Sequence, residues 1–135
     1  MRAIDAKILE ELDMHYDDKE CFASLDSWME NAKTYMINLN RLFMVADRTK
    51  QQYPSEANAI TDYCKRIVTL FNQTKEYASE WSSKSTEQSR MSTENYITAS
   101  EDSWDSLDSW TASQEKLRDE ILKLVDFLYS VDSEL

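Results

Sequence analysis

The sequence predicts an all-α fold, an elongated antiparallel helical bundle of three long helices and a short N-terminal helix with coiled-coil-like packing. Apolar residues recur along most of the chain at alternating spacings of three and four, which places them on one face of a helix. The 135 residues include no Gly and a single Pro, so the positive-φ turns of hairpin-rich β folds are hard to make. A chain of this length typically builds one core, and we therefore expect one domain over residues 1–135.

The first predicted helix is short and covers about residues 2–14. If the apolar seam of the following helix is extended backwards, it meets Glu11, His15 and Asp18, where apolar side chains are required. Asp17 and Glu20 also have the spacing of an N-capping box, in which side chains bond the free backbone N–H groups of a new helix. We therefore predict a break near residues 13–18.

The second predicted helix is long and covers about residues 18–52. Its seam, with Trp28, Tyr35 and Leu42 widening the stripe, consists of Phe22, Leu25, Met29, Ala32, Met36, Leu39, Phe43 and Ala46. Pro54 should end this helix, because the residue before a proline is pushed away from helical backbone angles. Ser55 has the residue type and position of a cap for the next helix.

Two further helices are predicted at about residues 55–82 or longer and about residues 98–133. The first has the seam Ala57, Ile60, Cys64, Ile67, Phe71, Thr74, Ala78 and Trp81, and the second has Leu107, Trp110, Gln114, Leu117, Ile121, Leu124, Leu128, Val131 and Leu135. Thr98 and Glu101 form a second capping-box spacing. The Ser-rich residues 82–97 lack helix breakers, so the sequence allows either a loop or a solvated helix there.

The pentapeptide SLDSW occurs at residues 24–28 and 106–110, with the near copy SEDSW at 100–104. At about 100° per residue, Trp104 and Trp110 lie about 60° to either side of Leu107, which points both indoles toward the interior. Asp108 lies about 100° from that centre, and Glu101, Asp105, Glu115 and Asp119 cluster with it on the same side of the helix. The repeat is therefore interpreted as Trp inside and Asp outside. In the alternative that Trp104 or Trp110 is exposed, the two Trp and the five acidic residues form a tentative partner-binding strip.

The residues that most catalytic and metal sites need are missing from the sequence. His15 is the single histidine, which excludes two-histidine metal sites and makes a Ser-His-Asp triad improbable. Without Gly there is no loop to cradle a phosphate. Cys21 and Cys64 are not a Cys-x-x-Cys pair, and in a hairpin they lie on the order of 30 Å apart, too far for a disulfide. We expect no enzyme activity, no cofactor, no metal and no small-molecule ligand.

The chain is acidic, with a net charge of -11, and residues 99–135 hold 3 basic and 10 acidic groups. This balance argues against direct binding to nucleic acid or to an anionic membrane through a basic patch. No stretch approaches the ~20 apolar residues of a membrane span. The unpaired cysteines and the amphipathic start MRAIDAKILEEL favour a cytoplasmic, reducing location.

The function that remains is a non-catalytic protein-protein interaction module, an adaptor, assembly subunit or chaperone-like partner, which docks another helical chain or a second copy of itself. Four Trp, seven Tyr and six Met support it, because these side chains suit adaptable helix-in-groove contacts. The alternative is an acidic nucleic-acid mimic that occupies the basic groove of a DNA- or RNA-binding protein. Its five acidic residues would be spaced comparably to phosphates.

Overall fold

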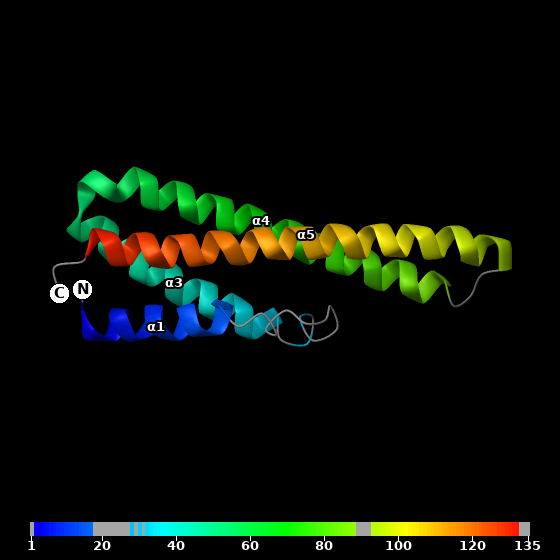
Figure 1. Cartoon of the computed structure of the whole chain (residues 1–135), viewed down its shortest axis with the longest axis horizontal. Helices are drawn as coiled ribbons and strands as arrows, with labels where there is room; N and C mark the ends of the chain where they lie inside the picture. The colour runs from blue at the N-terminus through cyan, green and yellow to red at the C-terminus, as the bar shows by residue number, and fades with distance from the viewer. Residues whose placement is uncertain (1, 18–27, 29, 31, 89–92, 133–135) are drawn as a thin grey trace. The chain divides into compact units, whose positions relative to one another are not determined.

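The computed structural model describes residues 2–17, 28, 30, 32–88 and 93–132, and every element in these ranges is helical. In chain order the elements are α1 (Ala3–Asp17), α3 (Ala32–Gln52), the 3-10 helix η2 (Pro54–Glu56), α4 (Ala57–Gln88) and α5 (Thr93–Val131) (Figure 1). The predicted all-α helical bundle is confirmed. The elongated shape and the coiled-coil-like packing stay predictions.

The end of α3 at Gln52 agrees with the prediction, whereas α1 continues past the predicted end at about residue 14, and the predicted start of the second helix at about residue 18 lies outside the described residues. Helix α1 ends at Asp17, and the proposed capping residue Glu20 lies outside the described residues. The expected cap at Thr98 is wrong, because α5 begins at Thr93 and contains Thr98. The Ser-rich segment 82–97 is helical at residues 82–88 and 93–97. Its residues 89–92 lie outside the described residues. Serine and threonine are only moderately poor helix formers, so they do not stop a helix that neither Gly nor Pro interrupts.

The turn between α3 and α4 is built without a glycine. The backbone N–H of Tyr53 donates to the Thr49 carbonyl at 2.8 Å, which closes the last turn of α3. Tyr53 then leaves the helical region (φ -126°, ψ 74°), as expected for a residue before proline, and Pro54 opens η2. Ser55 lies inside η2 and α4 begins at Ala57, so Ser55 is not the cap that the sequence suggested. Pro54 ends α3 as predicted.

The contacts within the chain define two compact units. Unit 1 consists of Met1–Val68 and Arg118–Leu135, and unit 2 consists of Thr69–Leu117. Helices α4 and α5 run through both units without interruption. The expectation of a single domain over residues 1–135 stays a prediction.

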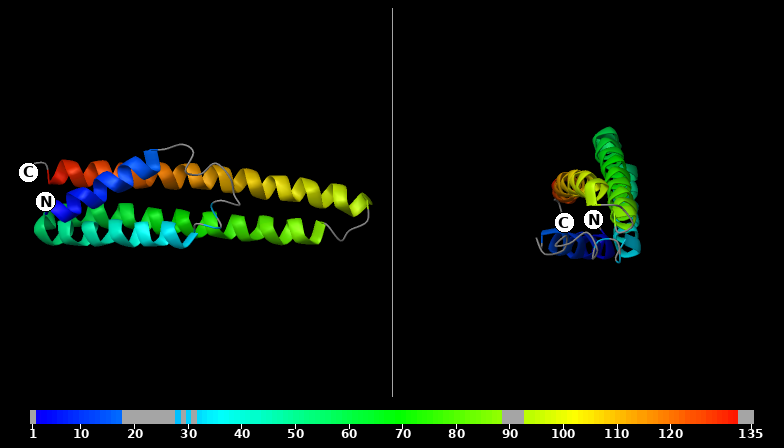
Figure 2. Two further views of the ribbon diagram at one scale, coloured as in Figure 1. Left: turned by 90° about the horizontal axis from the view of Figure 1, so that it is seen from below. Right: turned by 90° about the vertical axis from the view of Figure 1, so that its right-hand side faces the viewer.

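Unit 1 contains α1, α3, the first part of α4 and the last part of α5, and successive segments run in opposite directions (Figures 1 and 2). Tyr63 of α4 packs on Phe127 of α5 with ring centroids 5.3 Å apart. Arg66 lies 4.6 Å above the Tyr63 ring and pairs with Glu120 at 3.1 Å. The apolar core of this unit is made of Leu9, Leu12, Trp28, Tyr35, Leu39, Leu42, Val45, Ala46, Ile60, Ile67, Ile121, Leu124, Val125 and Leu128.

The buried stripe of α3 differs from the predicted seam. Tyr35 and Leu42, which were expected at the margin, are at most 5% exposed, whereas the seam residue Met36 is 45% exposed. Trp28 is also buried, and its ring stacks on Tyr35 at 6.0 Å. The buried stripe thus includes Leu39 and Ala46 of the predicted seam together with Tyr35 and Leu42 beside it, whose large side chains add apolar area to the core.

Unit 2 contains the remainder of α4 and α5, and its core includes a polar layer. The Thr74 hydroxyl donates to the Leu70 carbonyl at 2.7 Å and lies 2.7 Å from the Ser113 hydroxyl across the two helices. Gln114 is 7% exposed, and its side-chain carbonyl has no hydrogen-bond partner among the described residues. The apolar part of this core is made of Phe71, Ala78, Trp110 and Leu117. The predicted seams of α4 and α5 are confirmed at these positions.

Substitutions on α3 test which stripe is buried. Leu42→Ala should lower the free energy of unfolding by about 2–5 kcal/mol, because Leu42 is fully buried and leaves a cavity. Met36→Ala should change it by less than about 0.5 kcal/mol, because half of that side chain is already in water. Urea unfolding followed by circular dichroism compares the two variants. Equal losses would contradict the assigned stripe.

The polar layer of unit 2 is tested by a double-mutant cycle. Thr74→Val or Ser113→Ala alone should cost about 0.5–1.5 kcal/mol, because each removes the hydrogen bond between the two hydroxyls while the remaining hydroxyl keeps its bond to the Leu70 carbonyl. The double variant should cost clearly less than the sum of the two. The measurement is urea unfolding of the four proteins, and strict additivity would show that the two hydroxyls are not coupled.

Candidate protein-interaction surface

The acidic residues predicted to line one face of α5 are exposed wherever their side chains are described. In unit 2 these are Asp105, Asp108 and Glu115, which lie on the side of α5 opposite the buried Trp110. Asp119 is also exposed but belongs to the part of α5 in unit 1. The side chains of Glu101 and Trp104 lie outside what the structure describes. The three residues of unit 2 therefore form one acidic strip.

The aromatic member of this strip is in the core. Trp110 is 3% exposed, so the expectation that it points inward is confirmed. Its indole is not on the surface where Asp105 and Asp108 lie. The tentative site residues are therefore divided between an exposed acidic strip and a buried aromatic, and a partner of the strip would meet charge rather than an apolar anchor.

An exposed apolar surface lies instead on α3 in unit 1, where the apolar spacing of the sequence did not predict one. Ile37 is 58% exposed and Met44 is 54% exposed. They are one heptad apart, so they lie about 20° apart on the helix, on the side away from Leu42. With the neighbouring Met36 they form what we call the outer face of α3. The signal available in the sequence was a pair of apolar residues one heptad apart, Ile37 and Met44, that lie outside the predicted seam.

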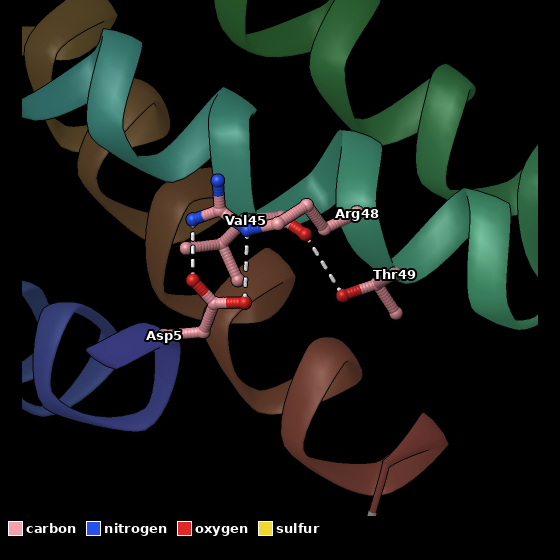
Figure 3. A network of polar contacts seen from close by, with 4 residues as sticks. All are labelled: Asp5, Val45, Arg48 and Thr49. Atoms are coloured by element: carbon pink, nitrogen blue, oxygen red, sulfur yellow. Dashed lines mark hydrogen bonds and ion pairs between the residues drawn. The ribbon is translucent and has the colours of Figure 1, made fainter. Parts of the chain in front are cut away.

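Helix α1 is held against α3 by two ion pairs, and Figure 3 shows the one between Asp5 and Arg48. Asp5 is 4% exposed and its carboxylate accepts two hydrogen bonds from Arg48, one of them from Nε at 3.0 Å. Bonding to Asp5 raises the pKa of Arg48 above its ordinary value. Asp5 lies in the first turn of α1, where the helix dipole also favours a negative charge. This pair is the anchor of α1.

The second ion pair is on the surface. Arg41 donates to Glu11 at 2.8 Å, and the two side chains are 38% and 47% exposed. The hydrogen bond from Arg41 is the main cause of the lowered pKa of Glu11. Exposed pairs of this kind add little stability. Its main effect is on the orientation of α1, because it holds the side of α1 that carries Glu11 against α3.

No group of three His, Cys, Asp or Glu side chains among the described residues has the geometry of a metal site. Cys64 is half-buried, and burial raises the pKa of its thiol, so the reactive thiolate is disfavoured. Near it, an open depression of about 410 Å³ is lined by Asp47, Lys50, Gln51, Ala57 and Thr61. Asp47 and Lys50 pair with each other at 3.2 Å.

The described helices also include none with the length and hydropathy needed to cross a membrane. Comparison of the chain with protein-family models, with curated proteins and with solved structures finds no match. The candidate surface is therefore defined by its own geometry and charge.

The residue after α5 is joined to the α3–α4 turn by a part-buried polar contact. The Tyr53 hydroxyl donates to the Asp132 carboxylate at 2.7 Å. Burial opposes the charged form of Asp132, but hydrogen bonds, including the one from Tyr53, hold its pKa below the ordinary value. The ionised carboxylate therefore contributes stability above the ordinary pKa, and this contribution is lost as the pH falls through the folded-state pKa.

Tyr53→Phe tests this contact. We expect a loss of about 1–3 kcal/mol near pH 7, because the variant removes a hydrogen bond to a charged acceptor. The difference in the free energy of unfolding between the variant and the parent should decrease below pH 3.8, which is the ordinary pKa of the Asp132 carboxyl. Urea unfolding at several pH values measures it. Tyr63→Phe, which keeps the ring beside Phe127, is the control, and a pH-independent difference for Tyr53→Phe would contradict the assignment.

Proposed function

We propose that the chain is a non-catalytic helical interaction module, such as an adaptor, assembly subunit or chaperone-like partner, which docks a helix of another protein inside a reducing cell compartment. The observation that carries the proposal is the outer face of α3. Ile37, Met44 and Met36 are each about half in water although they belong to a helix whose other side is fully buried. When a partner covers the apolar groups that a helix exposes on its second side, the removal of this surface from water lowers the free energy.

The spacing of the outer face fits a helical ligand. Residues one heptad apart present two adjacent side chains along one line of the helix surface, as in helix-in-groove contacts. Two of the three apolar groups are methionines, whose flexible thioethers adapt to different partner surfaces. Between Ile37 and Met44 the exposed Asn40 lies on the same line, and a polar residue at such a position helps to select one register.

Charge gives this surface a preference among partners. Helix α3 carries Lys33, Arg41, Arg48 and Lys50 against the single acidic residue Asp47, in a chain of net charge -11. Arg41 and Arg48 pair with α1, whereas Lys33 is exposed near Ile37 and Met36. The favoured partner is therefore an amphipathic helix with apolar residues one heptad apart and an acidic flank.

The second candidate is an acidic mimic of nucleic acid, and the strip of α5 favours it. Asp105, Asp108 and Glu115 are exposed on one side of the helix. Their separations of three and seven residues correspond to rises of about 4.5 and about 10.5 Å, which are compatible with contacts to a basic groove. This candidate needs no apolar surface.

The test is made with the protein captured by the full-length chain from its native cells, once that protein is identified by mass and purified. Ile37→Glu with Met44→Glu should weaken its binding at least about tenfold, because both side chains would lose their apolar contacts. Asn72→Glu with Ser79→Glu is the matched control, since it adds the same charges at the same spacing on exposed positions of α4. Isothermal titration measures the affinities. Equal weakening by both double variants contradicts the proposal.

Salt and a second pair of substitutions separate the two candidates. Docking on the outer face of α3 should change less than about threefold in affinity between about 50 and about 500 mM salt, whereas a decoy should lose its partner steeply. Asp105→Asn with Asp108→Asn should leave docking unchanged. If this double variant instead abolishes binding and the affinity depends steeply on salt, the nucleic-acid mimic is supported and the helical interaction module is contradicted.

A further inference from the structure

The outer face of α3 is flanked by two exposed residues of opposite charge. Lys33 lies about one helical turn before Ile37, and Asp47, whose side chain is 64% exposed, lies about one turn after Met44. At about 100° per residue, these four side chains fall within a sector of about 80°, on the side of the helix away from the buried Leu42. The outer face therefore has apolar residues in its middle, a cation at one end and an anion at the other.

This order of charges is complementary to itself when two copies of α3 pack antiparallel. With a two-fold axis beside Asn40, Ile37 of one copy lies level with Met44 of the other, because the two residues are equally far from the axis. Lys33 then lies within one residue, or about 1.5 Å, of the level of Asp47 in the other copy. The axis repeats each contact, so two apolar pairs and two pairs of opposite charge form together.

A parallel pair of the same faces has no such match. Lys33 would meet Lys33 of the other copy and Asp47 would meet Asp47, so like charges would oppose the contact at both ends. The exposed Asn40 lies near the middle of the face in either arrangement. Charge therefore selects the antiparallel arrangement.

Lys33 and Asp47 do not satisfy each other within one chain. They are 14 residues apart on the same helix, so about 21 Å separates them along its axis. Asp47 does pair with Lys50 at 3.2 Å, but an exposed pair of this kind is weak. A carboxylate also accepts several hydrogen bonds at once, so Asp47 remains available to a cation of a second copy.

We propose that the outer face of α3 binds the outer face of a second copy, antiparallel about Asn40, and that this dimer covers the site until a partner helix replaces the second copy. The proposal deepens the function proposed above and rests on it for that partner. The second copy has the features of the favoured partner, because its α3 carries apolar residues one heptad apart and an acidic residue beside them. One pair of helix faces is small beside the about 1,200–2,000 Å² of a stable interface, so a partner can displace it.

Reversal of the two charges tests the arrangement, with sedimentation equilibrium of the full-length protein as the measurement. Lys33→Glu or Asp47→Lys alone should weaken the dimer about five- to tenfold, because each brings like charges together. The two changes combined should restore the affinity to within about twofold of the parent, because opposite charges again meet across the axis. A combined variant as weak as either single variant would overturn the pairing. A tighter dimer for Asp47→Lys would show a general effect of net charge and would also contradict it.

The apolar part of the contact is tested with the same measurement. Ile37→Glu with Met44→Glu should weaken the dimer at least about tenfold. Asn72→Glu with Ser79→Glu adds the same charges at exposed positions of α4 and should leave the affinity within about twofold of the parent. All four positions are exposed, so circular dichroism should show the helix content of the parent in both variants. Equal weakening by the two double variants would contradict the proposed interface.

A cysteine beside the axis reports both the geometry and the effect on the partner. In a chain with Cys21→Ser and Cys64→Ser, mild oxidation should link Asn40→Cys into a dimer. Gln51→Cys should stay unlinked, because residue 51 of one copy lies roughly 30 Å from residue 51 of the other. Linkage at both positions would show a parallel pair and overturn the proposal. The oxidised Asn40→Cys dimer should bind the captured partner at least about tenfold more weakly than the reduced form. Equal binding would show that the dimer leaves the site open and would overturn the proposal.

The outcomes separate this proposal from the previous one. A parent chain that stays monomeric up to about 1 mM, together with a partner whose binding depends on Ile37 and Met44, refutes the dimer alone. A dimer that shows the charge rescue, together with a partner that is indifferent to Ile37→Glu with Met44→Glu, refutes the proposed function and supports the self-association.

Discussion

Burial of one apolar stripe on each helix is the constraint on which the whole structure depends. With no Gly and one Pro, the chain has few ways to interrupt a helix. What can vary is mainly which side of each helix faces the core. Every contact described above follows from that choice. When Tyr35 and Leu42 turn inward, Ile37 and Met44 must turn outward, and Arg41 and Arg48 are placed at the margin where α1 can reach them.

Much of this could be predicted from the sequence, and the failures have a physical pattern. The seams of α4 and α5 and the end of α3 at Pro54 follow from local spacing and backbone sterics. On α3 the buried stripe shares Leu39 and Ala46 with the predicted seam, and packing against the neighbouring helices determines that Tyr35 and Leu42 are buried while Met36 is not. Thr98 had the spacing of a cap but lies inside α5, because a capping motif acts only where a helix would otherwise end.

The candidate surfaces also include features that the sequence predicts and features that it does not. The exposure of Asp105, Asp108 and Glu115 and the burial of Trp110 could be predicted, since a helical wheel separates them. The pair of Asp5 with Arg48 joins residues 43 positions apart, and no local pattern indicates it. The outer face of α3 was also missed, because the sequence assigns Met36 to a core that in fact excludes it. Long-range partners, rather than residue types, determine these features.

Unit 1 is assembled from both ends of the chain, Met1–Val68 and Arg118–Leu135. During synthesis the first helices therefore leave the ribosome well before the closing segment that completes their core. Until Ile121, Leu124 and Leu128 emerge, the apolar sides of α1 and α3 lack part of their cover. Until then the nascent chain exposes apolar surface. At this stage it is most accessible to chaperones and most prone to aggregation.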